Sequence, residues 1–168
     1  MNERFPAPGR VIDKSMGTGR YLGLAASLLP EATIIWLKRD SLGCAWSCFR
    51  THFLAGVEWS YDLEDIAFHF RLEDQTMDRW QQILGERLLV VPYEELVGDP
   101  AIWTRRIMGH CGLAEEPQVF EPHGHRRTVT TSSVMQVRKP ISGRAVGSAE
   151  PYRHYLQPFV GAYQRDCY

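Results

Sequence analysis

Residues 33–47 read TIIWLKRDSLGCAWS and decide the fold of the chain. Thr33 to Leu37 are mostly β-branched or apolar and follow a proline, which predicts a short buried strand. Charged residues then interrupt the apolar run. Asp40 and Ser41 both favour the N-cap position, so we expect a helix to begin there and to run through Phe49.

The order of strand, basic residue and capped helix places Arg39 at the carboxyl edge of the predicted sheet. The free N–H groups and the dipole of the helix start favour an anion there. Ligands of open α/β sheets also bind at this edge. Ser47 lies about two helical turns further on, so it reaches the same anion only if the anion lies along the flank of the helix. An Arg-Asp pair at a strand end is also compatible with a plain surface position.

Composition indicates one ordinary globular domain. The 168 residues carry 19 Lys and Arg against 20 Asp and Glu, a balance that argues against a general nucleic-acid or membrane-surface binder. The first ten residues, MNERFPAPGR, contain no apolar signal core and predict a flexible lead-in. The four cysteines show no CxxC spacing, which favours reduced thiols and a cytoplasmic location.

The remaining chain predicts alternating strands and helices, and therefore an α/β fold with a parallel sheet covered by helices. A second strand is expected over 87–91, with a possible short strand over 11–14. Helices are expected over 21–29, 62–84, 100–111 and 150–164. Asp99 is the expected N-cap of the third of these helices, and Gly85 the end of the second. We take residues 11–168 as a single domain.

Lys14 precedes a predicted helix just as Arg39 does. Two cations of this kind suggest one anionic ligand, although two unrelated surface charges fit the spacing as well. Residues 126–141 are basic and rich in hydroxyl groups, and they lack the spacing of an amphipathic helix. Such a segment is typical of a loop over a site, and its donors suit a phosphate or a sulfate.

Four segments in order, VIDKSMG, LLPEATIIWLKRDSLGCAWSCF, VPYEELVGDP and RTVTTSSVMQVRKPI, resemble the sulfotransferases of the bacterial tetratricopeptide-linked type. These are similar to the tyrosylprotein sulfotransferases. The resemblance covers nearly the whole chain from Val11 onward. It implies a fold like that of the P-loop nucleoside triphosphate hydrolases. It also implies transfer of a sulfuryl group from 3′-phosphoadenosine 5′-phosphosulfate, the co-substrate, to a hydroxyl acceptor, possibly a protein tyrosine, without a metal.

The resemblance also implies roles for individual residues. Arg39 and Ser47 match the residues that bind the 3′-phosphate, and Lys14 matches the lysine near the transferred sulfuryl group, where a cation stabilises the transition state. The other matched residues lie on the nucleotide side of the cleft, and they are Tyr93, Arg127, Ser133, Gln136 and Lys139.

The chain departs from the family pattern in several places. K-x-P after the lysine and R-D-P-x-D after the strand are both altered, and a late tryptophan near Ala149 is missing. The 5′-phosphosulfate loop and the acidic general base of the family should precede Lys14, and the sequence shows neither. We therefore expect the first strand, loop and helix of the family domain to be absent, which puts the activity of this chain alone in doubt.

Four other possibilities remain. One is that the chain is a nucleotide-binding module without transfer. Another is that it is a fragment that depends on a partner segment or on self-association through an open sheet edge. A third is that a histidine replaces the missing base, and the candidates are His52, His69, His123 and His125. His69 is expected on a solvated face. A zinc site at His123 and His125 with Cys111 is the least favoured, because the spacing to the cysteine is long.

Overall fold

The computed structural model describes residues 10–14, 17–53, 56–124 and 139–165. The chain divides into two compact units, Met1–Glu31 and Ala32–Tyr168, which are described separately. Candidate residues Arg127, Ser133 and Gln136 lie outside the described residues, as does His125.

The first unit contains helix α1, Thr18–Leu28, which confirms the helix predicted over 21–29. Gly17 precedes α1 with φ 83°, a left-handed conformation that glycine adopts at little cost. The strand suggested for residues 11–14 is wrong. These residues have no regular structure, and Ile12 is 89% exposed, because a run of only two apolar residues is too weak a signal to specify a strand.

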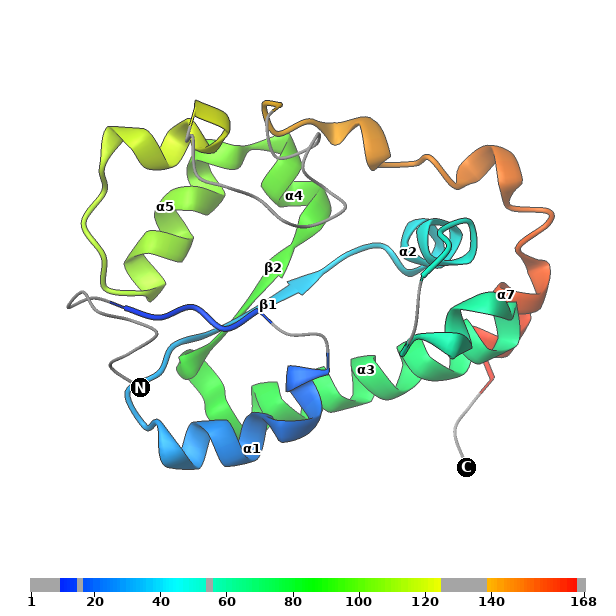
Figure 1. Cartoon of the computed structure of the whole chain (residues 1–168), viewed down its shortest axis with the longest axis horizontal. Helices are drawn as coiled ribbons and strands as arrows, with labels where there is room; N and C mark the ends of the chain where they lie inside the picture. Colours follow the sequence, from blue (N-terminus) through cyan, green and yellow to red (C-terminus); the bar gives the residue numbers. More distant parts are fainter. Residues whose placement is uncertain (1–9, 15–16, 54–55, 125–138, 166–168) are drawn as a thin grey trace. The chain divides into compact units, whose positions relative to one another are not determined.

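The second unit is built on two parallel strands, β1 (Ile34–Lys38) and β2 (Leu88–Pro92), as predicted. Their register pairs Ile34 with Leu88 and Lys38 with Pro92, so both strands end at the same edge. In Figure 1, α3 lies on one side of the strands, and α4 and α5 lie on the other. The expectation that β1 is fully buried is wrong. Its side chains alternate, and Ile35 and Leu37 are 43% and 55% exposed.

Helices α2 (Ser41–Phe49), α3 (Leu63–Leu84) and α5 (Pro100–His110) begin where the sequence predicts. Asp40, Asp62 and Asp99 cap them, each through a side chain that accepts backbone N–H groups of the first turn. Gly85 ends α3 with φ 54°, the positive φ expected of a glycine there.

Two helices differ from the expectation. Helix α4 (Tyr93–Gly98) directly follows β2, in a segment for which the sequence analysis assigned no helix. The helix predicted over 150–164 is wrong in length. Glu150–Tyr152 form a 3-10 turn, and α7 covers only Gln157–Tyr163. A proline lies in the first turn of α7, where its missing N–H costs nothing, which explains why the helix starts there. The other 3-10 turns are Glu58–Tyr61, Gly85–Arg87, Pro117–Phe120, Pro122–Gly124 and Gly143–Ala145.

The core of the second unit lies between α2, α3 and α7. Phe159 of α7 is 1% exposed, and its ring meets the edge of Phe70 of α3 with centroids 6.0 Å apart. The buried members of this core are Leu42, Ala45, Ile66, Ala67, Ala149, Leu156, Phe159 and Ala162. The side of α3 that carries Leu63, Ile66 and Phe70 is therefore a packing surface. No helix in the described ranges combines the length and apolarity needed to cross a bilayer.

Candidate functional site

Arg39 follows β1 directly and lies beside the first turn of α2. Its Nη2 donates a hydrogen bond to the carbonyl oxygen of Ala145 at 3.1 Å, which holds the guanidinium at the edge of the sheet. No ion pair joins Arg39 to any residue that the structure describes. Its charge is therefore balanced by no salt bridge within the described chain.

Tyr93 occupies the corresponding position after β2, as the first residue of α4. Because the register aligns the last residues of the two strands, Arg39 and Tyr93 come to the same edge. The guanidinium carbon lies 5.1 Å from the centroid of the tyrosine ring. This cation–π contact restricts where the guanidinium can move. The structure thus brings together two residues that the sequence resemblance had placed on the nucleotide side.

Gly43 explains one departure from the family pattern. A Cβ at this position would lie 3.0 Å from Asp40 Oδ2 and 3.4 Å from Arg39 Nη2. A side chain there would have to displace the capping carboxylate or the guanidinium. Gly43 stands where the R-D-P-x-D pattern has its second carboxylate. The lack of a side chain there lets Arg39 lie close to the backbone of α2.

The amides at the start of α2 differ from the expectation. The Gly43 N–H donates to Asp40 Oδ2 at 2.7 Å, and the Asp40 N–H donates to Glu94 Oε1 at 3.0 Å. The sequence predicted free amides for an anionic ligand, and that prediction is wrong for these two groups, since carboxylates of the chain bind them. The attraction for an anion here therefore comes from Arg39 more than from the helix start.

A cavity of about 280 Å³ opens at this edge of the sheet. It is lined by two cations, two carboxylates, two hydroxyl groups and two apolar residues of β2. The lining residues are Lys38, Arg39, Asp40, Ser41, Val90, Pro92, Glu94 and Tyr163. The carboxylates each hold a backbone N–H, as described above, so both are already engaged within the chain. We refer to Arg39, Asp40, Gly43, Tyr93 and Glu94 as the Arg39 site.

One wall of the cavity is a network of polar side chains that no pattern in the sequence predicts. Lys38 Nζ lies 3.0 Å from Asp74 Oδ1, and the hydroxyl of Tyr163 donates to Asp74 Oδ2. Burial and this hydrogen bond raise the pKa of Tyr163 to about 12. Lys38 is thus paired, and Tyr163 stays a neutral donor at physiological pH. No local pattern signals these contacts, because the three residues come from β1, α3 and α7.

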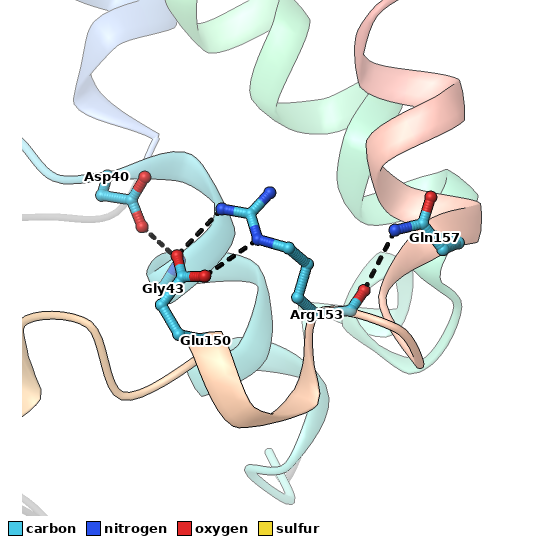
Figure 2. Close-up of polar contacts among 5 residues, drawn as sticks. All are labelled: Asp40, Gly43, Glu150, Arg153 and Gln157. Carbon is cyan, nitrogen blue, oxygen red and sulfur yellow. Dashed lines mark hydrogen bonds and ion pairs between the residues drawn. The ribbon is translucent and has the colours of Figure 1, made fainter.

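Figure 2 shows a second arginine near the cap of α2. Arg153 Nε and Nη2 each lie 2.9 Å from an oxygen of Glu150, and the Arg153 carbonyl accepts from Gln157 Nε2 at 3.3 Å. The bond from Arg153 lowers the pKa of Glu150, so this carboxyl is ionised. Arg153 is therefore already neutralised by its neighbour, unlike Arg39.

Ser47 is half-buried on α2, and its carbonyl accepts from Thr51 Oγ1 at 2.6 Å. It lies roughly 9 Å along the helix from Ser41, at a rise of 1.5 Å per residue. Within the described residues no hydrogen bond joins the Ser47 and Arg39 side chains. A ligand that meets both would have to extend along the flank of α2.

No hydrogen bond or ion pair within the described residues joins Lys139 to the Arg39 site. Lys14 is exposed and belongs to the first unit, and Lys139 is exposed where the last described segment begins. The prediction that His69 lies on a solvated face is wrong. Its ring stacks on Trp59 with centroids 3.8 Å apart, because that side of α3 packs against the 3-10 turn before it. Among the described residues no group of three or more His, Cys, Asp or Glu is arranged to hold a metal ion.

Comparison with known proteins identifies the family of the chain. Residues 2–117, more than half of the chain, match the sulfotransferase family. The chain belongs to the sulfotransferase family. An uncharacterised protein of Aquifex aeolicus (strain VF5) is 29% identical over 154 residues, which cover 90% of this chain and 20% of that protein. This sulfotransferase-family chain thus spans about one fifth of the length of that relative.

Proposed function

We propose that this chain binds 3′-phosphoadenosine 5′-phosphosulfate and takes part in transfer of its sulfuryl group to a hydroxyl acceptor, either a small molecule or a peptide tyrosine. The family membership supports the reaction class. The observation that carries the proposal is the position of Arg39, at the carboxyl edge of two parallel strands and over the ring of Tyr93. Nucleotides bind α/β sheets at this edge.

The charges of the cavity fit an anionic group at Arg39. Lys38 is paired with Asp74, and Asp40 and Glu94 hold backbone amides. Arg39 donates to a neutral carbonyl, so its planar guanidinium keeps further donors for a phosphate. We propose that it binds the 3′-phosphate, with Ser47 reaching the same group along α2.

The remaining roles follow from the resemblance and stay proposals. Tyr93 would lie beside the nucleotide, and Lys14 would stabilise charge on the transferred sulfuryl group. The segment with Arg127, Ser133, Gln136 and Lys139 would cover the phosphates. The co-substrate supplies the activated sulfuryl group, and the chain supplies orientation and charge stabilisation.

The first test is calorimetric titration with 3′-phosphoadenosine 5′-phosphate. We expect the wild-type chain to bind and Arg39→Ala to bind roughly tenfold to hundredfold more weakly, because one charged hydrogen-bonded contact is lost. The matched control is Arg79→Ala, an exposed arginine of α3 that does not line the cavity, and it should bind like the wild type. Equal affinity of all three chains, or no binding by folded wild type, would overturn the proposal.

A binding module without transfer is the second candidate. It is favoured by the two carboxylates that line the cavity, because Asp40 and Glu94 each already accept a backbone N–H and neither is assigned as a general base. A transfer assay with radiolabelled sulfuryl donor and a panel of phenols, sugars and tyrosine peptides separates the two. Turnover that falls in Arg39→Ala supports the enzyme, whereas nucleotide binding without turnover on any acceptor supports the module.

We also propose a cytoplasmic location and no nucleic-acid, membrane or metal partner. Within the described chain Cys44, Cys48 and Cys111 form no disulfide, which supports a reducing compartment. Pairing with an additional segment or with a second copy also stays a proposal. Localisation of a tagged chain in cells, beside size-exclusion chromatography with light scattering, tests both points.

A further inference from the structure

Two thiols, those of Cys44 and Cys48, lie on one face of α2, the helix that follows Arg39. Cys44 and Cys48 are four residues apart, the spacing that brings side chains together on a helix. Both are half-buried, neither forms a disulfide, and their side chains share a hydrogen bond. The proposed function gives neither thiol a role.

The surroundings of the two thiols favour charge on one of them. Cys44 lies in the first turns of α2, at the positive end of the helix dipole, and it follows Gly43, against which the Arg39 guanidinium packs. The hydrogen bond from Cys48 and the charge of Arg39 lower the pKa of Cys44, against burial and the carboxylates of Asp40 and Glu94. The same hydrogen bond and burial raise the pKa of Cys48. The place of Cys44 near the start of α2 and beside Arg39 thus favours ionisation of Cys44 over that of Cys48.

We propose that Cys44 is a site of covalent modification by soft electrophiles, with Cys48 as the donor that stabilises its thiolate and Arg39 as the neighbouring cation. In the reaction with iodoacetamide, Cys44 loses its proton to solvent, its sulfur forms a bond to the methylene carbon, and iodide leaves. The thiolate is the reactive form of cysteine, so the three-residue cluster decides which thiol reacts.

Cys111 provides a control within the same chain. It is also half-buried and free of disulfides, but it lies at the C-terminal end of α5, where the helix dipole disfavours negative charge. The hydroxyl of Thr33 lies 3.8 Å from its sulfur. Partial exposure alone would make Cys44 and Cys111 react at similar rates.

The experiment is alkylation of the folded full chain with iodoacetamide from pH 6 to pH 9, followed by peptide mass spectrometry of each cysteine. At pH 7 we expect Cys44 to react on the order of tenfold faster than Cys111. Cys48→Ala should slow Cys44, whereas Cys48→Ser, which keeps a donor, should restore most of the rate. Circular dichroism checks that both variants are folded. Equal rates at Cys44 and Cys111, or a Cys44 rate unchanged in folded Cys48→Ala, would overturn the proposal.

A second arm connects this site to nucleotide binding and rests on the proposed function. An anion bound at Arg39 offsets the charge that stabilises the Cys44 thiolate, so saturating 3′-phosphoadenosine 5′-phosphate should slow alkylation of Cys44 and leave Cys111 unchanged. If calorimetry shows binding and Cys44 is not protected, this connection is wrong. If calorimetry shows no binding, the proposed function fails, and the rates without nucleotide still decide the modification site.

Discussion

The guanidinium of Arg39 lies over the ring of Tyr93, 5.1 Å from its centroid, although the two residues follow different strands. The parallel register of β1 and β2 produces this contact, because it ends both strands at one edge. Together with the bond to the Ala145 carbonyl, the ring therefore fixes the one guanidinium found among the described residues that line the cavity.

Replacement of Tyr93 tests whether its ring or its hydroxyl matters. Tyr93→Leu removes the cation–π contact, worth about 0.5–1 kcal/mol at exposed sites, and should weaken binding of 3′-phosphoadenosine 5′-phosphate by about two- to fivefold. Tyr93→Phe keeps the ring and should bind within about twofold of the wild type. Calorimetry measures both. An equal loss in the two variants would show that the hydroxyl, and not the ring, carries the effect.

Glu94 combines a structural role with an unfavourable charge. Its Oε1 accepts the Asp40 N–H at 3.0 Å, and it lines the cavity. Glu94→Gln keeps an oxygen acceptor and removes one negative charge, so nucleotide binding should tighten by about threefold. Glu94→Ala also loses the acceptor and should lower the free energy of unfolding by about 1 kcal/mol.

The matched control is Glu95→Gln, which changes the same charge at an exposed neighbour outside the cavity lining. Calorimetry and urea unfolding give the two readouts. Similar tightening in Glu95→Gln would mean that only net charge is responsible, and the local role of Glu94 would then be wrong.

Tyr163 predicts a pH dependence of stability. Its pKa is raised to about 12 in the folded chain, by burial first and by Asp74 second. Below about pH 10, the ordinary pKa of tyrosine in the unfolded chain, the folded and unfolded states both keep the hydroxyl proton. The full contribution of Tyr163 to stability is then present. Between about pH 10 and 12 the unfolded state loses the proton first, so stability falls as pH rises.

Urea unfolding from pH 9 to pH 12 should therefore show a smaller loss of stability for Tyr163→Phe than for the wild type. The comparison with this variant removes the contribution of other groups that titrate in the same range. Parallel pH profiles would contradict the role assigned to the Tyr163 hydroxyl.

Phe159 tests the core between α2, α3 and α7. It is 1% exposed, so Phe159→Ala removes buried contacts and leaves a cavity, and it should lower the free energy of unfolding by about 3–5 kcal/mol. Tyr155→Ala is the control, because Tyr155 is 68% exposed and its loss should cost less than about 0.5 kcal/mol. Urea unfolding measures both, and similar losses would show that the core lies elsewhere.

The local elements of this fold are predictable because their signals are local. The strand before Arg39 follows from β-branched residues, and the starts of α2, α3 and α5 follow from three aspartates at N-cap positions. Gly85 ends α3 for an equally local reason. Residues 11–14 failed as a strand because propensity without a neighbouring strand is a weak signal.

The site is less predictable because its contacts are distant in sequence. Arg39 was found from its place after a strand, but its bond to the Ala145 carbonyl spans 106 residues. The contact between Asp74 and Tyr163 spans 89 residues, and no spacing rule indicates it. The binding of Glu94 to the Asp40 amide likewise depends on strand register, which a sequence pattern does not give.

The central claim is that Arg39 recognises a 3′-phosphate, and a comparison of two nucleotides tests it most directly. Calorimetry with 3′-phosphoadenosine 5′-phosphate and with adenosine 5′-phosphate, on wild type and Arg39→Ala, isolates that single group. We predict that the wild type prefers the 3′-phosphorylated nucleotide by about tenfold or more, and that Arg39→Ala loses this preference. A preference that survives in folded Arg39→Ala would contradict the account.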